Sequence, residues 1–289
     1  LAGAGSLGLL IPPSIVMIVY GVLAEVSVAR LFAAGVFPGL MLAGLYSLYV
    51  GAVSLLRPDM APAEEDPPGW RDLALGLWNL IPIAVLIFIV LGSIYSGIAT
   101  PSEAAAVGVV TTIALTLVTG QFRFKLAFES LISSVQTSCM IAVILIAAGF
   151  LSTAMGFLHV PQDVATAIAS FDLTPFQLIA VLAVFYVILG MFLEGISITV
   201  MSLPITLPLI ISAGFDPIWF GVFLVIMVEL AQITPPIGFN LFIIQGLTHT
   251  PILRVALYAA PFFVLMCLGA ALITVFPEIA LWLPQVLFA

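Results

Sequence analysis

Charged residues are scarce in this chain of 289 residues, because Asp, Glu, Lys and Arg together make up 7% of it, whereas soluble domains carry roughly 25%. Hydrophobic residues account for 63% and the mean hydropathy is +1.34. This composition excludes an ordinary soluble domain and predicts a polytopic membrane protein that is embedded in the lipid bilayer. Six basic residues and a net charge of −8 also make nucleic acid a poor candidate partner.

Cysteine and histidine are rare as well, with two of each. Cys139 and Cys267 lie inside apolar runs, where we expect small buried hydrophobic side chains and no disulfide. The sequence has no HExxH motif, no GxSxG motif and no paired aspartates within apolar runs, which argues against an intramembrane enzyme. The chain begins at Leu1 with no basic segment before its first apolar run, so we expect neither a signal peptide nor the natural start of the protein.

Apolar runs long enough to cross a bilayer need about 20 residues. One segment differs from such a run, because two apolar arms at 174–213 are joined by the polar sequence EGIS at 194–197, and the second arm contains Pro204 and Pro208. This pattern predicts a re-entrant helical hairpin whose tip faces a cavity rather than lipid. We predict an all-α bundle in which the remaining runs cross at about 1–23, 31–56, 77–98, 104–119, 130–157, 217–247 and 252–276.

The basic residues predict the orientation of these spans. If 174–213 enters and leaves on one side, Arg30 falls alone on one face and five basic residues fall on the other. The positive-inside rule then makes the five-residue face cytoplasmic, places the C-terminus outside and makes the acidic, Pro-rich segment 57–72 a cytoplasmic connector. The five residues are Arg57, Arg71, Arg123, Lys125 and Arg254.

Three glutamates are candidates for function. Glu103 follows Thr100 and Pro101 in the sequence GIATPSEAAAVG, a pattern typical of a capping box, and a role toward a partner or a substrate path stays open. Glu194 and Glu229 lie deep inside apolar runs. An ionisable group there either marks a cavity, ion path or proton path, or accepts hydrogen bonds from backbone donors at a helix end.

Two matching segments contain a proline pair inside an apolar run. LGLLIPPSIVMIVYG at 7–21 aligns without gaps with part of VELAQITPPIGFNLFIIQG at 228–246. Proline lacks an N–H group and disfavours a helical predecessor, so nearby carbonyls lose their helical donors and become able to bind a cation. Such paired, broken helices indicate an inverted-repeat secondary transporter, with simple proline kinks as the alternative. We predict breaks at Pro12, Pro13, Pro235 and Pro236.

At these residues the sequence resembles the large membrane subunit of the tripartite ATP-independent periplasmic (TRAP) transporters. The resemblance rests on four motifs in order: LGLLIPPSIVMIVYG, YSGIATPSEAAAVG, LGMFLEGISITVMSLPITLP and DPIWFGVFLVIMVELAQITPPIGFNLFIIQG. It implies a sodium-coupled importer of small carboxylates, such as a C4-dicarboxylate or a sialic acid-like acid, in the bacterial inner membrane. A small membrane subunit and a periplasmic substrate-binding protein are the implied partners, and the C-terminus is expected in the periplasm.

The resemblance also implies an elevator mechanism and a division of the chain. The broken helix at 1–23 and the hairpin with the second broken helix at 174–250 would form the transport domain. Residues 24–173 would be largely scaffold, and 251–289 would hold the C-terminal transmembrane helix. The family's first hairpin would lie before Leu1, so this chain alone should not transport.

Carried over by motif, the resemblance assigns two sodium sites and no other metal or organic cofactor. Ser197 and Asn240 are the candidates for contacting a substrate carboxylate or hydroxyl. The second sodium site would use the carbonyls of Ala231 and Ile237, with Thr234 and the hairpin tip near Gly195, and the first would use Gly8, Ile11 and Ser14.

A channel, a structural membrane subunit and a proton-coupled organic anion transporter remain alternative interpretations.

Overall fold

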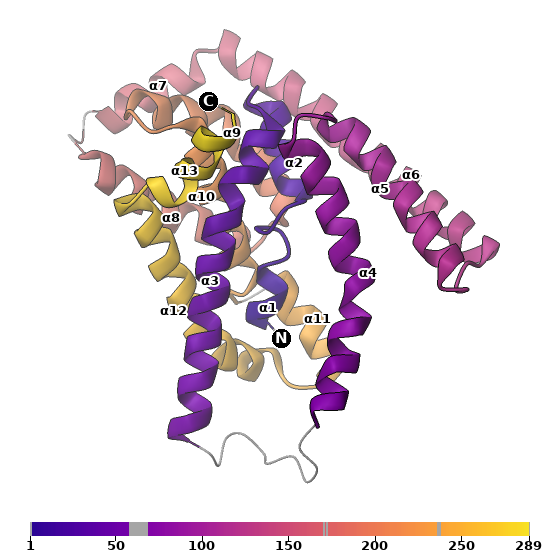
Figure 1. The fold of residues 1–289 in the computed structure, drawn as a ribbon. Helices are drawn as coiled ribbons and strands as arrows, with labels where there is room; N and C mark the ends of the chain where they lie inside the picture. The colour runs from indigo at the N-terminus through magenta and orange to yellow at the C-terminus, as the bar shows by residue number, and fades with distance from the viewer. Residues whose placement is uncertain (1, 58–68, 170, 172, 236–237, 289) are drawn as a thin grey trace. The chain divides into compact units, whose positions relative to one another are not determined.

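The computed structural model describes residues 2–57, 69–169, 171, 173–235 and 238–288. Within this described part, helices α1 to α13 follow one another and no strand occurs (Figure 1). The predicted all-α class is therefore confirmed. Among the described residues, six helices are long and apolar enough to cross a membrane, judged by length and composition: α3 (Val28–Leu56), α4 (Trp70–Tyr95), α5 (Pro101–Val118), α6 (Phe124–Phe157), α9 (Gly195–Ser212) and α12 (Ile252–Val275).

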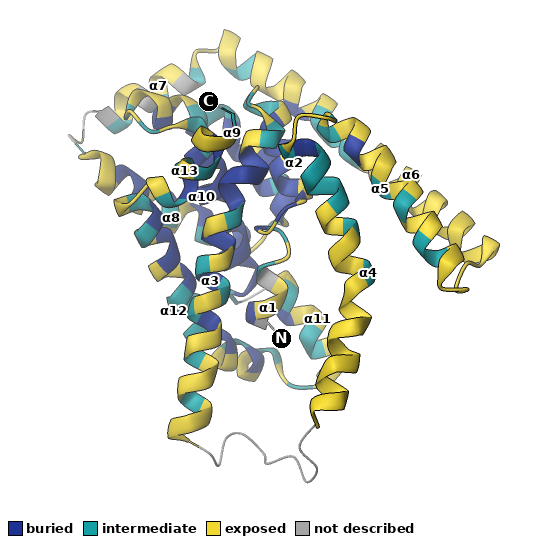
Figure 2. Ribbon diagram, viewed as in Figure 1, coloured by how far each residue is buried: buried dark blue, intermediate teal, exposed yellow. Residues whose placement is uncertain are grey.

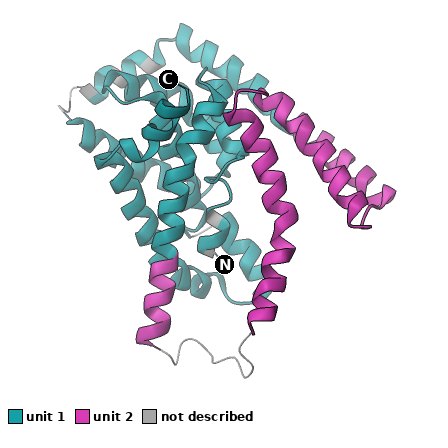
Figure 3. Cartoon of the chain, in the orientation of Figure 1, with its two compact units in different colours: residues 1–46, 140–289 teal, residues 47–139 magenta. Residues whose placement is uncertain are grey.

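The chain divides into two compact units, Leu1–Tyr46 with Met140–Ala289 as unit 1 and Ser47–Cys139 as unit 2 (Figure 3). Unit 2 contains α4 and α5, which pack against each other and expose most of their apolar surface (Figure 2). Unit 1 contains both proline-pair segments and the predicted hairpin. The assignment of moving and static domains stays a prediction.

Local sequence explains where α4 and α5, which lie wholly within unit 2, begin. The Thr100 N–H donates to Glu103 Oε2 at 2.8 Å, and the Glu103 N–H donates to Thr100 Oγ1 at 3.4 Å, which confirms the capping box. At α4, the Gly69 N–H donates to Asp72 Oδ2 at 3.0 Å. The predicted connector 57–72 is therefore too long, because its last three residues are helical, and residues 58–68 lie outside the described part.

Unit 1 is built around α10 (Pro217–Gln232), in which every residue from Trp219 to Gln232 is buried (Figure 2). This helix packs against α2 (Ile15–Leu23), α8 (Pro175–Gly190), α9 and α12. Its start is fixed by two hydrogen bonds from bulky side chains. Trp219 Nε1 donates to the Ile273 carbonyl at 2.7 Å, and the Tyr20 hydroxyl donates to the Pro217 carbonyl at 2.5 Å. α10 is thus the central helix of the unit.

The predicted hairpin is present as α8 and α9, joined by residues 191–194. Thr174 caps α8, because its hydroxyl accepts the Gln177 N–H at 3.4 Å. The buried Tyr186 hydroxyl lies 2.9 Å from Thr206 Oγ1 and accepts a hydrogen bond from Ser202 Oγ at 3.1 Å. These bonds join the two arms inside an apolar surrounding, where polar groups need partners. The depth of the tip in a membrane stays a prediction.

Both proline-pair segments are interrupted helices, as predicted. The first consists of α1 (Ala2–Ser6) and α2, separated by residues 7–14. The second consists of α10 and α11 (Phe239–Thr248), separated by residues 233–238, of which 236 and 237 lie outside the described part. Pro12, Pro13 and Pro235 all lie in the non-helical stretches, whereas Pro236 falls outside the described residues.

Three features of unit 1 differ from the sequence-based expectations or were not anticipated. The helices α7 (Val160–Ala169) and α13 (Glu278–Leu287) occur where no span was predicted, since each has 10 residues and is too short to cross a bilayer. Cys267 is exposed, as is Cys139 of unit 2, so the expected burial of both cysteines is wrong. An apolar run on a bilayer helix does not distinguish an inward face from an outward one.

Candidate functional site

The tip of the hairpin packs onto the C-terminal end of α10. A Cβ atom at Gly190 would clash with Ala231 Cβ, and one at Gly195 would lie 2.6 Å from Val228 Cγ1 and 3.4 Å from Gln232 Nε2. Only glycine allows this approach of the hairpin backbone to α10. The sequence analysis predicted Gly195 near the second break. It did not name Gly190, which is a further contact; the glycine at the end of the first arm was the feature of the sequence that could have indicated it.

The first broken segment reaches the same tip. A Cβ at Gly195 would lie 3.7 Å from Val16 Cγ2 of α2. Ile196 and Val200 of α9 form a buried apolar cluster with Val19 of α2. The start of α9 therefore lies between α2 and the end of α10, and the two broken segments converge on one hairpin.

At the second break the Thr234 hydroxyl uses its proton in a hydrogen bond to the preceding helix, so its oxygen can still bind a cation. Thr234 Oγ1 donates to the Leu230 carbonyl at 2.7 Å, which leaves lone pairs on Oγ1 for a cation. The Ala231 carbonyl accepts the Thr234 N–H at 3.0 Å, so it is engaged on one lone pair rather than fully freed. The Ile237 carbonyl, the other predicted ligand, lies outside the described residues.

Two carbonyls that the sequence had not singled out face the start of α11. A Cβ at Gly238 would lie 2.8 Å from the Thr234 oxygen and 3.0 Å from the Gln232 oxygen. The backbone of Gly238 thus approaches both oxygens closely. The proline pair predicted that carbonyls near the break would lose their helical hydrogen-bond donors. Which carbonyls come close to the start of α11 depends on the path of the backbone.

At the first break the predicted oxygens come from the loop and from the cap of α2. The Gly8 N–H donates to the Gly5 carbonyl at 3.2 Å, and the Ile11 N–H donates to the Leu7 carbonyl at 3.0 Å. The carbonyls of Gly8 and Ile11 themselves accept no hydrogen bond from another described residue. The buried Ser14 hydroxyl caps α2 by accepting the Met17 N–H at 3.3 Å. This break therefore combines two carbonyls without a donor among the described residues and, at the start of α2, a buried hydroxyl.

The two glutamates that lie inside apolar runs of the sequence differ in the structure, because Glu194 is exposed and Glu229 is buried. Glu194 is the N-cap of α9 and accepts the Ile196 N–H at 3.1 Å, the Ser197 N–H at 2.9 Å and the Ser197 hydroxyl at 2.9 Å. This confirms a capping geometry for Glu194 and also engages the hydroxyl of the predicted substrate residue Ser197. Glu229, on α10, is 1% exposed and accepts the Leu9 N–H at 3.1 Å.

Asn240 lies in the first turn of α11, directly after the second break. Its Nδ2 atom is buried and has no hydrogen-bond partner among the described residues. A buried amide donor without a partner costs free energy, so such a group is available to a ligand that brings an acceptor. Of the two predicted substrate residues, Asn240 has the free donor and Ser197 does not.

The charges around the breaks are few. In the described ranges the one ion pair is Lys125 with Glu129, at 3.9 Å on the exposed surface of α6, and neither residue belongs to a broken segment. Within the same ranges no three His, Cys, Asp or Glu side chains gather as a metal cluster. The oxygens at the two breaks are therefore mainly neutral carbonyls and hydroxyls, which are the ligand type that hard cations accept.

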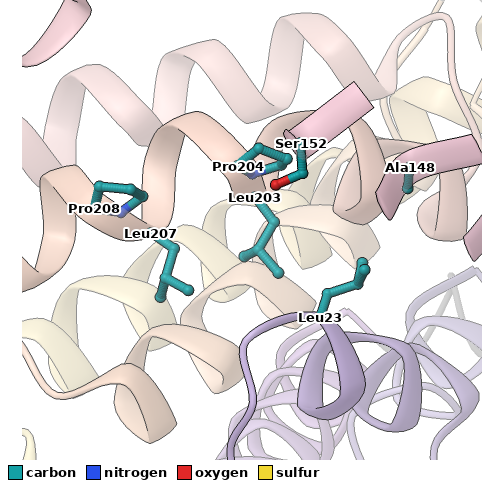
Figure 4. A pocket seen from close by; sticks show the side chains of 7 residues that line it. All are labelled: Leu23, Ala148, Ser152, Leu203, Pro204, Leu207 and Pro208. Atoms are coloured by element: carbon teal, nitrogen blue, oxygen red, sulfur yellow. The ribbon is translucent and has the colours of Figure 1, made fainter. Parts of the chain in front are cut away.

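A separate cavity of about 180 Å³ lies in unit 1 between α2, α6 and α9 (Figure 4). Ser152 supplies the one hydroxyl of its lining, and Pro204 and Pro208 contribute ring surfaces from α9. Such a lining suits an apolar group better than a carboxylate. The full lining is Leu23, Ala148, Ser152, Leu203, Pro204, Leu207 and Pro208.

These features define an all-α membrane protein in which two broken helices and a helical hairpin meet. The family described as Tripartite ATP-independent periplasmic transporter, DctM component, matches residues 1–279, and the chain belongs to this family. The family and the six apolar helices together indicate a multi-pass inner-membrane protein. The resemblance noted in the sequence is thereby confirmed.

Relatives align with nearly the whole chain. It is 34% identical over 284 residues to the C4-dicarboxylate TRAP transporter large permease protein DctM of Pseudomonas aeruginosa, covering 98% of this chain and 66% of that protein. It is 31% identical over 293 residues to the Ectoine TRAP transporter large permease protein TeaC of Halomonas elongata (99% and 66%). It is 26% identical over 287 residues to the Sialic acid TRAP transporter permease protein SiaT of Haemophilus influenzae (97% and 45%).

The chain thus spans about two thirds or less of the length of these relatives. Their names are those of transport permeases and not of enzymes, in agreement with the absence of catalytic motifs from the sequence.

Proposed function

We propose that this chain belongs to the large membrane subunit of a sodium-coupled importer of a small organic acid, and that it works by an elevator-type exchange of access. The observation that carries the proposal is the meeting of both broken helices with the hairpin tip at Gly195. Paired broken helices around one site are the arrangement in which inverted-repeat transporters hold substrate and coupling ions.

Sodium is the coupling ion that the oxygens at the breaks favour. Sodium accepts neutral carbonyl and hydroxyl ligands, and these groups bind it without having to lose a proton. We assign one site to Gly8, Ile11 and Ser14, and the other to Gly195, Thr234 and the carbonyls near Ala231. Occupation of both sites would stabilise the broken segments, because a cation replaces the helical donors that the proline pairs remove.

The substrate class that fits is a small organic acid, on two grounds. The N-terminus of α11 carries the positive end of a helix dipole and the free amide of Asn240, and both favour an anionic oxygen. The three relatives are named for a C4-dicarboxylate, ectoine and sialic acid. These relatives are named for different compounds, although their sequence identities to this chain are similar, at 34%, 31% and 26%. We therefore propose small organic acids as the substrate class and name no single compound.

Family membership also supports two partners, a small membrane subunit and a periplasmic substrate-binding protein. We place the C-terminus in the periplasm. In support, Arg30 Nη2 donates to the Phe288 carbonyl at 2.8 Å, so the one basic residue expected outside lies next to the end of α13. Delivery by a binding protein separates this function from that of a channel, because uptake by a channel would continue without the binding protein.

The test is a sodium titration of uptake by the assembled transporter in proteoliposomes, with substrate supplied by the binding protein. Thr234→Val keeps the branched shape and deletes the hydroxyl. Losing one oxygen contact to a charged group costs about 1.5 to 3 kcal/mol. We therefore expect the sodium concentration for half-maximal uptake to rise by roughly 10-fold or more.

The matched control is Thr248→Val, because Thr248 Oγ1 donates to the Ile244 carbonyl at 2.8 Å in the same four-residue pattern but lies outside the break. An unchanged sodium curve for Thr234→Val would show that the hydroxyl is not a ligand. If replacing Pro235 and Pro236 by alanine also leaves the curve unchanged, the second break is only a kink and the sodium-site proposal fails.

A further inference from the structure

Glu229 is the buried acidic side chain that the two proposed sodium sites leave unassigned. It is 1% exposed and stands on the central helix α10, with buried Val228 and Leu230 on either side. One of its oxygens, Oε1, accepts the Leu9 N–H at 3.1 Å, and the other, Oε2, has no partner among the described residues. A buried carboxylate of this kind calls for an explanation, because a charge in an apolar surrounding is costly.

The partner of Glu229 lies inside the first break. Leu9 follows Gly8 and is two residues before Ile11, so its N–H belongs to the loop that carries both proposed backbone ligands of the first site. The neighbouring donors of this loop, the N–H groups of Gly8 and Ile11, bond to carbonyls within the segment itself. The Leu9 N–H is the one that leaves the segment and reaches a side chain 220 residues away.

We infer that Glu229 is a positioning residue for the first sodium site: by accepting the Leu9 N–H, it fixes the loop of the first break in the form that presents the Gly8 and Ile11 carbonyls. This inference rests on the proposed function for the identity of the ion, but the positioning contact does not depend on any ion. It also gives α10 a second role, since its end forms the second break while its Glu229 orders the first.

The hydrogen bond from the Leu9 N–H to Oε1 is the observation behind the positioning role, and Oε2 is the oxygen that direct ligation of an ion would use. Glu229 accepts one backbone N–H through Oε1, whereas the cap residue Glu194 uses both of its oxygens on backbone donors of α9. A carboxyl group offers an acceptor oxygen to a backbone N–H in either protonation state. The reach of the side chain decides this contact, so a shorter acid should lose it even though the carboxyl group is retained.

The first measurement follows the loop without sodium. In a background with Cys139→Ser and Cys267→Ala, Leu9→Cys keeps the backbone N–H and reports the exposure of the half-buried Leu9 position through its rate of thiol labelling in detergent. Glu229→Met and Glu229→Asp should each raise this rate by roughly 5-fold or more, because the buried hydrogen bond is lost. Glu229→Gln should stay within about 2-fold, because its amide oxygen still accepts the Leu9 N–H.

The second measurement is the sodium concentration for half-maximal thermal stabilisation of the same variants. We expect Glu229→Met and Glu229→Asp to raise it by roughly 10-fold, while Glu229→Gln stays within about 2-fold. If Glu229→Gln shifts the sodium curve as far as Glu229→Met, the carboxylate binds the ion directly and the positioning role is overturned.

The matched control is Thr206→Val, which removes a buried hydrogen bond between the hairpin arms and leaves the loop of the first break untouched. It should lower the unfolding temperature without changing the labelling of Leu9→Cys. Equal labelling in all Glu229 variants contradicts the inference, and so does faster labelling in Thr206→Val. If the parent protein shows no stabilisation by sodium but the labelling contrast persists, the proposed sodium coupling fails while the positioning contact stands.

Discussion

The two broken segments share a proline pair and differ in almost everything around it. The first break is held by side chains: Ser14 caps α2, and Glu229 holds the loop through Leu9. The second is held by close packing, because the glycine-lined hairpin tip presses against the end of α10. Ile11 of the first break is 40% exposed, whereas α10 is buried up to Gln232. A proline pair thus specifies where a helix stops, and the surrounding helices specify how the gap is supported.

The most decisive test of this comparison asks whether the two broken segments cross the membrane in opposite directions. If the segments are inverted repeats, Ser27 after the first and Thr248 at the end of the second lie on opposite sides of the membrane. In a cysteine-free background, Ser27→Cys should react with an impermeant thiol reagent in intact cells, and Thr248→Cys should react only after permeabilisation. Labelling of both from the same side would show that the segments run parallel and that the predicted topology is wrong.

The second test addresses the packing that supports the second break. Gly190→Ala places a methyl group against Ala231 Cβ, so overpacking should lower the free energy of unfolding by about 1 to 3 kcal/mol and abolish most uptake. Gly246→Ala is the control, because nothing lies within 4 Å of a Cβ there and alanine favours the helix. Thermal unfolding in detergent measures both. Equal stability of the two variants would remove the argument for a close approach.

The third test separates the two hydroxyls of the proposed sodium sites, which stand on opposite sides of their proline pairs. Without sodium, Ser14→Ala should destabilise the protein by about 1 kcal/mol, since the α2 cap is lost. Thr234→Val should change stability by less than about 0.5 kcal/mol, since its hydroxyl bonds a carbonyl that already belongs to a helix. Unfolding curves in sodium-free and sodium-containing buffer check this. The comparison fails if both variants lose the same stability without sodium.

The smallest effect on uptake is expected for Glu194→Gln at the hairpin tip, which both segments contact. Glu194→Gln keeps one acceptor oxygen for the N-terminal donors of α9, so uptake should stay within about 2-fold of wild type. Glu194→Leu removes both acceptors and should cost about 1 to 2 kcal/mol of stability. Transport assays at equal membrane abundance decide the matter. Loss of uptake in Glu194→Gln alone would give this carboxylate a role in the ion path.

Local patterns made much of the fold predictable. The capping boxes at Thr100 and Thr174, the proline-pair breaks and the polar EGIS turn each depend on residues within a few positions of one another. The short helix α7 escaped prediction because it cannot span a bilayer. The exposure of Cys139 and Cys267 escaped it because lipid and protein interiors select the same apolar residues.

The candidate site was only partly predictable for a related reason. The breaks themselves followed from proline chemistry, whereas the assignment of Ser14, Thr234 and Gly195 to sodium sites stays a prediction. The engagement of the Ser197 hydroxyl by Glu194 and the reach of Glu229 to Leu9 depend on side-chain directions and on tertiary contact. No spacing in the sequence encodes a contact between positions 220 residues apart.

That long separation between Leu9 and Glu229 has a consequence for how the protein is made. Chains grow at about 5 to 20 residues per second, so the acceptor for the Leu9 N–H is synthesised roughly 10 to 40 s after its donor. During this interval the Leu9 N–H lacks the acceptor that it has in the folded chain. This donor must bond to water, lipid head groups or the insertion machinery until α10 arrives. Ordering of the first break is therefore a late event of biogenesis, and truncation before Glu229 leaves it unanchored.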